Sequence, residues 1–174
     1  MEEHKFIFRR AEIDDMKPVR EMIQELADFE EMSDGPELTE EDLIRDSGLS
    51  GGKEYCHIYI LELEKGVNKS ETIPIGYSIC FFAFSMFQSI RTYFLEDLYV
   101  RPQYRGIGAG AYLFRKIASK AKEYNSDSMD FHVLAWNPAR KFYQKMGAIN
   151  STETKDLHFY RLTEPQIEAL ARKL

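Results

Sequence analysis

The sequence carries its most diagnostic signal in the run Gln103-Tyr104-Arg105-Gly106-Ile107-Gly108-Ala109-Gly110. Glycines at alternate positions remove every second side chain, so consecutive backbone N–H groups can converge on one anion. At the start of a helix, unpaired amides and the helix dipole also favour negative charge. The run therefore predicts a phosphate site, with Arg105 as an added cation. Dinucleotide, nucleotide triphosphate and coenzyme A sites all use this physics, so the flanking sequence has to identify the ligand.

The glycine run lies between a predicted buried strand at 92–100 and a predicted amphipathic helix at 111–124. Further strands are predicted at 6–10, 55–63, 73–84, 129–134 and 157–162. Further helices are predicted after Asp14-Asp15, after Thr39, near Pro138 and near Pro165. An antiparallel front half joined to a βαβ-like back half predicts an α/β fold with a mixed sheet, as a single domain over residues 1–174.

Composition narrows the class of partner. The 174 residues carry a formal charge of -6, which argues against nucleic acid as the main partner and would suit a cationic substrate. The same charge could simply aid solubility. No apolar run approaches the roughly 20 residues needed to cross a bilayer, and the charged start is unlike a signal peptide. We therefore expect a cytoplasmic protein with no membrane partner.

Cysteine and histidine give little sign of a reactive or metal centre. Cys56 and Cys80 are the only cysteines and lack CxxC spacing, so we expect reduced, partly buried thiols, with a catalytic cysteine as the minor alternative. The four histidines show no metal-ligand spacing, and we expect no metal.

Two carboxylates, Glu96 and Asp97, interrupt the predicted strand before the glycine run. Buried carboxylates require a reason. A bulge or a strand end that faces solvent would explain them without any function. Next to a phosphate loop, they are also candidates for chemistry.

A second informative patch covers residues 136–148. Its periodicity predicts a short helix with Phe142 and Met146 inward and Gly147 as its left-handed cap. The residue types add more, because Asn137, Ala139 and Phe142-Tyr143 recur in a known pattern.

Together these motifs resemble the GNAT superfamily of acyl-CoA-dependent N-acyltransferases. Arg105-x-x-Gly108-x-Gly110 matches its cofactor signature, and the patch from Asn137 to Tyr143 matches a later motif. Within the superfamily, the sequence resembles the branch of spermidine/spermine N-acetyltransferase and thialysine N-acetyltransferase. The strings that carry this likeness are ELADFE at 25–30, YFLEDLYV at 93–100, YRG at 104–106 and AWN at 135–137.

The resemblance implies a GNAT-like fold with a mostly antiparallel, twisted sheet that splays at an acetyl-CoA site, and a homodimer. Backbone amides at 98–100 would pair with the pantetheine arm, and 106–111 would hold the pyrophosphate. The implied cofactor-binding residues are Leu98, Tyr99, Val100, Arg105, Gly106, Ile107, Gly108, Ala109, Gly110, Ala111, Asn137, Pro138, Ala139, Arg140 and Tyr143.

Aminolysis of a thioester requires a neutral amine, a polarised carbonyl and a proton for the departing thiolate. At a lysine-like pKa near 10.4, about one amine in 2,500 is neutral at pH 7, which corresponds to roughly 4.6 kcal/mol. We expect Glu96 to be buried near the strand end and to act as the base through a water. Tyr143 is the expected acid, and the backbone N–H of Leu98 is a plausible oxyanion donor.

The resemblance also implies an acceptor pocket. The residues that would border the amine are Phe29, Glu30, Glu96, Asp130, Phe131 and His132. Glu30 and Asp130 could hold a cationic chain, although acidic residues at a helix end and a strand edge are often simply solvated. The imidazole of His132 could carry protons or clash with a second ammonium group.

Three departures separate the chain from the polyamine enzyme. Met86 or Phe87 stands where that enzyme has an acid, Lys155-Asp156-Leu157 replaces a Glu-Gly-Trp string, and the gap from Asn137 to Tyr143 is one residue short. We therefore expect an acetyl-CoA-dependent N-acetyltransferase of a small primary amine, with thialysine or a related amino acid or diamine ahead of spermidine. The alternatives are a spermidine/spermine acetyltransferase, a protein-lysine or N-terminal acetyltransferase, and a non-catalytic acyl-CoA-binding module.

Overall fold

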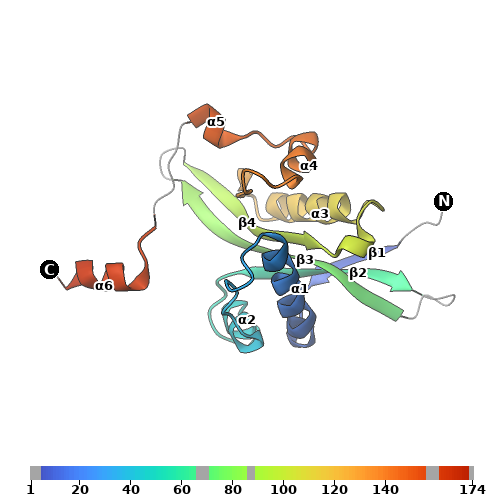
Figure 1. Ribbon diagram of the computed structural model, residues 1–174, viewed down its shortest axis with the longest axis horizontal. Coiled ribbons are helices and arrows are strands. Elements are labelled where there is room, and N and C mark those ends of the chain that lie inside the picture. Colours follow the sequence, from blue (N-terminus) through green and yellow to red (C-terminus); the bar gives the residue numbers. More distant parts are fainter. Residues whose placement is uncertain (1–4, 66–70, 86–88, 156–160, 173–174) are drawn as a thin grey trace. The chain divides into compact units, whose positions relative to one another are not determined.

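The computed structural model describes residues 5–65, 71–85, 89–155 and 161–172. The chain divides into two compact units, Met1–Leu134 and Ala135–Leu174, which are described separately. The first unit contains the sheet and three helices, and the second contains short helices (Figure 1).

The first unit is formed around an open five-stranded sheet in the order β1-β2-β3-β4-β5. The strands are β1 (Phe6–Arg10), β2 (His57–Lys65), β3 (Glu71–Ser85), β4 (Ile90–Val100) and β5 (Ser128–Asp130). The first four pair antiparallel, whereas β5 pairs parallel to β4. This arrangement confirms the predicted mixed, mostly antiparallel sheet.

Helices α1 (Met16–Phe29) and α2 (Glu40–Asp46) pack on one face of this sheet (Figure 1). Apolar residues of α1, including Met22 and Ile23, join Ile58 and Ile60 of β2 in one buried cluster. Their helical spacing on α1 and alternate spacing on β2 are what place them on facing surfaces. Thr39 caps α2, as predicted, by accepting a hydrogen bond from the backbone N–H of Asp42 at 3.2 Å.

Helix α3 (Ala109–Glu123) packs on the opposite face, and Leu113 and Ile117 are fully buried beneath it. Tyr59 alternates with Ile58 and Ile60, so its ring points to this second face. There its hydroxyl lies 3.3 Å from that of Tyr124, the residue that follows α3. The buried hydroxyl of Tyr93 joins the group, 3.2 Å from Tyr59 Oη and 2.7 Å from Nδ1 of His57. His57 is therefore a core residue, as expected for a histidine without ligand spacing.

The second unit contains α4 (Ala139–Lys145), α5 (Ser151–Lys155) and α6 (Glu164–Ala171). Gly147 follows α4 with φ 100°, which confirms its predicted left-handed cap. Thr163 lies at the N-cap of α6, in agreement with the helix predicted near Pro165, whereas the sequence did not predict α5.

Two predicted strands differ from the structure. The strand expected at 129–134 is wrong beyond Asp130, because the ladder with β4 ends at the pair Phe94 and Asp130. Phe131 then packs its ring edge-on against Phe114 of α3, with centroids 5.8 Å apart. The strand expected at 157–162 lies mostly outside the described residues, and Arg161 and Leu162 are not in a strand.

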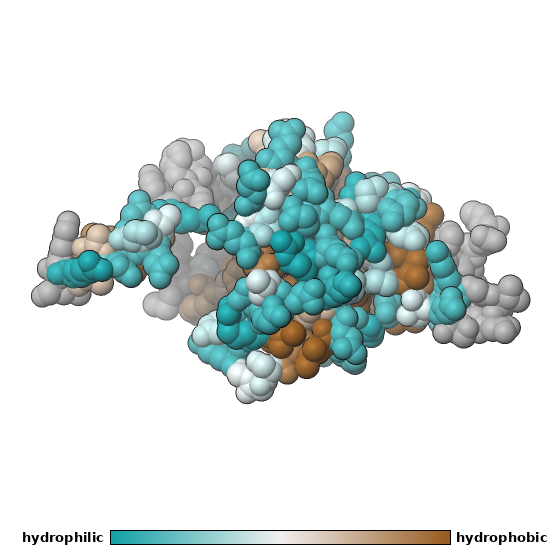
Figure 2. All heavy atoms as spheres, turned by 60° about the horizontal axis from the view of Figure 1, so that its bottom comes forward, coloured by the Kyte–Doolittle hydropathy of each residue, from teal (hydrophilic) through white to brown (hydrophobic). Residues whose placement is uncertain are grey.

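The surface is predominantly hydrophilic on the face drawn in Figure 2, with hydrophobic residues in separate groups. Across the described ranges, none of the helices combines the length and apolarity that a membrane crossing demands.

Candidate active site

The glycine run forms the turn that connects β4 to α3. A short 3₁₀ turn, η2 (Pro102–Tyr104), follows β4, and the backbone then adopts φ 80° at Gly106 and 92° at Gly108. A Cβ atom at either position would meet no atom within 4 Å, so the left-handed backbone and not the available space requires glycine. Helix α3 begins at Ala109, two positions before the predicted 111, so that Gly110 lies in its first turn.

Backbone donors are available in this turn. Within the part of the chain that the structure describes, no N–H group of residues 106–111 donates a hydrogen bond to another backbone or side-chain acceptor. The neighbouring edge of β4 is also open, because its pairing with β5 stops at Phe94 while β4 continues to Val100. Free amides of a helix N-terminus therefore lie next to an unpaired strand edge, which is an arrangement that can bind an anion and an extended amide chain.

Arg105 does not extend freely from the loop. Its Nε donates a 2.8 Å hydrogen bond to the carbonyl oxygen of Val100. Its guanidinium carbon lies 5.6 Å from the ring centroid of Phe29 and 5.5 Å from that of Tyr99. The cation expected beside a phosphate thus lies between the end of β4 and the end of α1.

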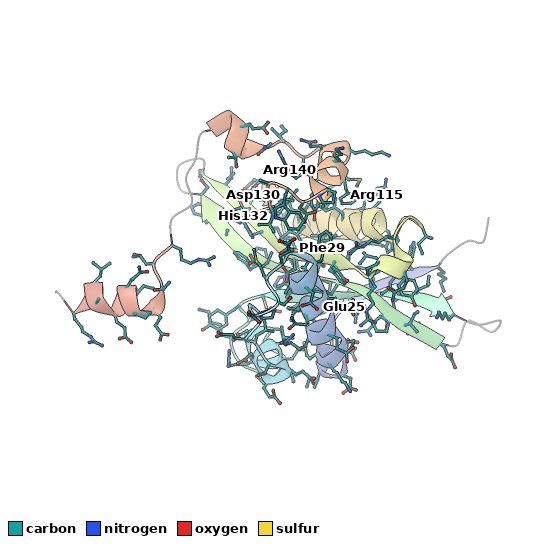
Figure 3. All side chains as sticks on the ribbon, in the orientation of Figure 1. Glu25, Phe29, Arg115, Asp130, His132 and Arg140 are labelled. Atoms are coloured by element: carbon teal, nitrogen blue, oxygen red, sulfur yellow. The ribbon has the colours of Figure 1, made fainter. Side chains whose placement is uncertain are left out.

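The end of β4 is tied to α1 by a second set of polar contacts. The hydroxyl of Tyr99 donates to one oxygen of Glu25 at 2.9 Å, and Nε of Arg101 donates to the other at 3.0 Å. Burial and the hydrogen bond to Glu25 raise the pKa of Tyr99 to about 12. Figure 3 shows that Glu25 and Phe29 both come from α1.

The expected burial of Glu96 is wrong. Ile79 pairs with Asp97 and Cys80 pairs with Leu95, so Glu96 is an extra residue in a β-bulge and its side chain is exposed. The bulge removes Glu96 from the alternation that would otherwise bury it. The explanation by a solvent-facing bulge, which was considered for both carboxylates, therefore holds for Glu96 but not for Asp97.

Asp97 is the carboxylate that is drawn into the fold. The hydroxyl of the fully buried Tyr77 donates to Oδ2 of Asp97 at 3.1 Å. Burial, followed by repulsion from Glu96 and Glu30, raises the pKa of Asp97 to about 6. Burial and the Asp97 charge also hold the pKa of Tyr77 well above its usual value. The charge of Glu30 acts on Asp97, so the end of α1 and the bulge contribute to one acidic environment.

Sequence reasoning named Asp97 beside Glu96 but gave it no specific role, and it missed Tyr77. One signal that Asp97 faces inward was present. Asp97 lies two residues before Tyr99, and counting back from that buried tyrosine places Asp97 on the same face. The alternation does not extend from Asp97 to Leu95, because the bulge at Glu96 interrupts it.

The other predicted acceptor residues follow from the end of β5. Asp130 is exposed and pairs with Phe94, and the ring of His132 lies edge-on to Phe94 with centroids 5.2 Å apart. Figure 3 labels Asp130 and His132. Both therefore neighbour β4 just before the bulge, whereas Phe131 packs against α3 and not beside His132. Phe29 is 40% exposed at the end of α1, followed by the partly buried Glu30.

Residues at the start of the second unit are held by local polar contacts. The side-chain oxygen of Asn137 accepts a 2.9 Å hydrogen bond from the backbone N–H of Ala139, which follows Pro138 and begins α4. Arg140 donates to the carbonyl oxygen of Ala135 at 3.0 Å. These bonds explain why an asparagine and an arginine serve the local fold here, independently of any contact with a cofactor.

Tyr143, the expected acid, lies in α4 and is partly buried. Its ring meets that of Phe142 edge-on, with centroids 5.1 Å apart.

The two thiols lie outside this chemistry. Both are free, and burial raises the pKa of Cys56 to about 11 and that of Cys80 to about 12. A thiol with so high a pKa is a poor nucleophile at neutral pH, so the catalytic-cysteine alternative loses support. In the described ranges, no three His, Cys, Asp or Glu side chains are grouped to hold a metal ion.

Comparison with known proteins assigns the family. The profile described as "Acetyltransferase (GNAT) family" matches residues 19–148, and the chain belongs to this family. Members of the family use acetyl-CoA. The chain is accordingly an acyltransferase, and its relatives support an amine N-acetyltransferase.

The relatives belong to the branch that the sequence resembles. The chain is 32% identical over 165 residues to thialysine N-epsilon-acetyltransferase of Mus musculus, covering 94% of this chain and 95% of that protein. It is 31% identical over 169 residues to the Sus scrofa protein of the same name, covering 96% and 98%. It is 29% identical to spermidine/spermine N(1)-acetyltransferase-like protein 1 of Homo sapiens, covering 95% of this chain and 24% of that protein.

Solved structures support the fold. An integron cassette protein from the mobile metagenome of V. cholerae matches with a TM-score of 0.68 and 21% identity, over 96% of this chain and 98% of that one. A probable acetyltransferase matches with a TM-score of 0.69 and 19% identity, over 90% and 97%.

Proposed function

We propose that this protein is an acetyl-CoA-dependent N-acetyltransferase that acts on the primary amine of a small cationic substrate. The substrate class is thialysine or a related amino acid, diamine or polyamine. The observation that carries the proposal is the set of free amides at 106–111 beside the open edge of β4. This arrangement suits a phosphate group joined to an extended amide chain, which describes coenzyme A.

In this proposal the acetyl donor binds along the first unit. Because β5 leaves that edge open, the amide of Val100 pairs with the pantetheine arm as an added strand would, and the amide of Leu98 faces the thioester. The amide of Tyr99 between them points to β3, as does the amide of Arg101, which donates to the carbonyl oxygen of Ile75. The turn at 106–111 receives the pyrophosphate. By the family resemblance, the remaining cofactor contacts come from Asn137, Pro138, Ala139, Arg140 and Tyr143, and residues 1–174 act as one catalytic domain.

The acceptor side suits a cation. The charges of Glu30 and Glu96 both act on Asp97, and Asp130 is exposed at the end of the neighbouring strand. A bound ammonium group relieves the repulsion among these carboxylates. Relatives named as thialysine acetyltransferases support thialysine as the amine in this proposal. The thioether near its amine lowers the basicity of that amine, so deprotonation is easier.

The proposed chemistry assigns one role to each of three groups. Glu96 acts as the base through a water, and its exposure in the bulge leaves room for that water. The amine nitrogen attacks the thioester carbonyl, the backbone N–H of Leu98 stabilises the oxyanion, and Tyr143 gives a proton to the departing thiolate. These groups must together help to supply the roughly 4.6 kcal/mol needed to reach the neutral amine at pH 7.

A spermidine or spermine acceptor is the second candidate, favoured by the relative with that name and by the acidic side chains. The absence of acids at Met86 and Lys155 speaks against a long polycation. Met86 lies outside the described residues.

A panel assay tests the function. The purified protein is mixed with acetyl-CoA and separately with thialysine, putrescine, spermidine and a histone-tail peptide, and free thiol release is followed. We expect the highest kcat/KM with thialysine. Activity on the peptide alone would contradict the proposal, and firm coenzyme A binding without turnover of any amine would indicate a binding module.

We further propose that the protein is a cytoplasmic homodimer. The exposed Phe82 and Phe84 of β3 give an apolar surface that a second copy could cover. A monomeric mass by light scattering at working concentration would contradict this assembly.

A further inference from the structure

We propose that Arg105 is a positioning residue that couples the acetyl-donor loop to the amine pocket, so that each substrate strengthens the binding of the other. This inference rests on the proposed function and concerns its two substrates. It assigns to Arg105 a task beyond that of a cation near a phosphate.

The contacts of Arg105 join the two sides of the site. Its backbone belongs to the loop that precedes Gly106, and its Nε is engaged with the carbonyl oxygen of Val100 at 2.8 Å. Its guanidinium faces the rings of Phe29 and Tyr99 at 5.6 and 5.5 Å from their centroids. The loop would bind the donor, whereas Phe29 ends the helix that leads into Glu30. A single planar side chain therefore connects both binding regions.

The helix that receives Arg105 presents one continuous face to the end of β4. Glu21, Glu25 and Phe29 are spaced by four residues, so they lie along one side of α1. Arg101 contacts Glu25 at 3.0 Å and Glu21 at 3.5 Å, and Arg105 contacts the third member. The two arginines bracket the turn η2, so the turn and this helix face are held together at both ends.

Coupling follows from this geometry. Pyrophosphate bound at 106–111 orders the loop next to Arg105 and fixes the guanidinium over Phe29. Fixing Phe29 also limits the motion of Glu30, whose charge already acts on Asp97 in the bulge. Because binding linkage is reciprocal, an amine that orders Phe29 and Glu30 must strengthen donor binding by the same factor.

The opposing arrangement is a guanidinium that leaves the two rings to contact phosphate once the donor binds. Arg105 would then contribute to donor affinity alone. The two arrangements differ in whether donor affinity depends on the amine, and in whether that dependence requires the Phe29 ring.

Calorimetry with coenzyme A measures this dependence without turnover. The Kd of coenzyme A is determined alone and with the amine that performs best in the panel assay, at saturation. We expect the amine to lower the Kd about two- to fivefold, the range that one cation–π contact supports. Arg105→Lys keeps the charge but loses the Nε bond and the planar contact, and Phe29→Leu keeps an apolar side chain but loses the ring.

Whatever its Kd for coenzyme A alone, each variant should lose the effect of the amine on that Kd. The double variant should lose no more of this effect than either single variant. Glu21→Gln is the matched control on the same helix face. It removes an exposed 3.5 Å contact to Arg101 and should leave the amine effect intact. Circular dichroism and thermal melting verify that each variant is folded.

The outcomes separate this inference from the proposed function. If coenzyme A binds and an amine is acetylated, but the Kd is independent of the amine or the variants keep the full effect, the coupling is overturned while the function stands. The coupling is also overturned if Arg105→Lys changes only the Kd of coenzyme A measured without amine, while Phe29→Leu behaves like wild type. If no coenzyme A binds at all, the proposed function itself fails.

Discussion

The proposed donor side of the candidate site consists of backbone groups, whereas the proposed acceptor side consists of side chains. Gly106 and Gly108 adopt left-handed conformations that leave consecutive amides free, and their spacing is visible in the sequence. The acceptor side depends on Asp97, Glu96 and Glu30, whose burial is set by a bulge and by the end of α1. A site built from backbone geometry is thus readable in a motif, but a site built from side chains depends on register.

The largest effect should come from Tyr143, the proposed acid. Tyr143→Phe removes only the phenolic hydroxyl, and we expect kcat to fall by about 10²- to 10⁴-fold, the range for a lost general acid. Steady-state thiol release measures kcat. Tyr112→Phe is the control, because the Tyr112 hydroxyl donates to the backbone carbonyl oxygen of Phe6 at 3.3 Å and turnover should persist without it. Unchanged kcat in Tyr143→Phe would remove this residue from the mechanism.

The next largest effect concerns Asp97, whose charge on the proposed acceptor side lowers the free energy of unfolding. A pKa raised from 3.8 to about 6 means that ionised Asp97 destabilises the fold by up to about 3 kcal/mol at neutral pH. Asp97→Asn should therefore raise the free energy of unfolding at pH 7.5 while the KM for the amine increases. Urea titrations measure the first quantity and initial rates the second.

The direction of the Asp97 pKa shift determines how this stability difference changes with pH. The destabilisation is complete above the folded pKa of about 6 and disappears as the pH falls toward the usual value near 3.8. The stability difference between Asp97→Asn and wild type should therefore shrink between pH 7 and pH 4. A difference that is constant over this range would mean that Asp97 does not titrate as its surroundings indicate.

A smaller effect is expected from the donor side. Gly108→Ala places a Cβ on a backbone with φ 92°, which costs about 1 to 2 kcal/mol, and it distorts the converging amides. We expect the Kd of coenzyme A to rise about tenfold. Gly51→Ala is the matched control, since φ is 84° there and a Cβ also meets no atom within 4 Å, so that strain arises away from the loop. Equal loss of coenzyme A affinity in both variants would mean that the loop geometry has no special role.

The smallest effect is expected from His57 in the core, and it serves as a reference for the pH dependence of stability. Burial, with the nearby charge of Arg10, holds the pKa of His57 below its usual value, so the folded state favours the neutral ring. The unfolded chain binds a proton more readily, so stability should fall as the pH drops below about 6.5. Measured in the Asp97→Asn background, this slope should be reduced by His57→Gln. An unchanged slope would assign it to other groups.

Much of the fold could be predicted because local signals agree with the tertiary structure. The strand–loop–helix around Gly106 and Gly108, the α2 cap at Thr39 and the α4 end at Gly147 each follow from residue type and spacing. The strand expected at 129–134 was too long, because pairing with β4 ends once Phe131 packs on α3. Periodicity reports which residues are apolar, but it does not report where a partner strand stops.

The family, the mixed sheet and the position of the glycine turn between β4 and α3 could all be predicted from the sequence. Sequence motifs and glycine spacing carry this information because they act through the local backbone. The different environments of the two carboxylates depend on the tertiary structure, since one extra residue in β4 exposes Glu96 and directs the partly buried Asp97 toward Tyr77. Only the tertiary structure also brought Arg105 against Phe29, because that contact depends on packing α1 beside the end of β4. The environment of a side chain depends on strand register and packing, and a local motif predicts neither of them.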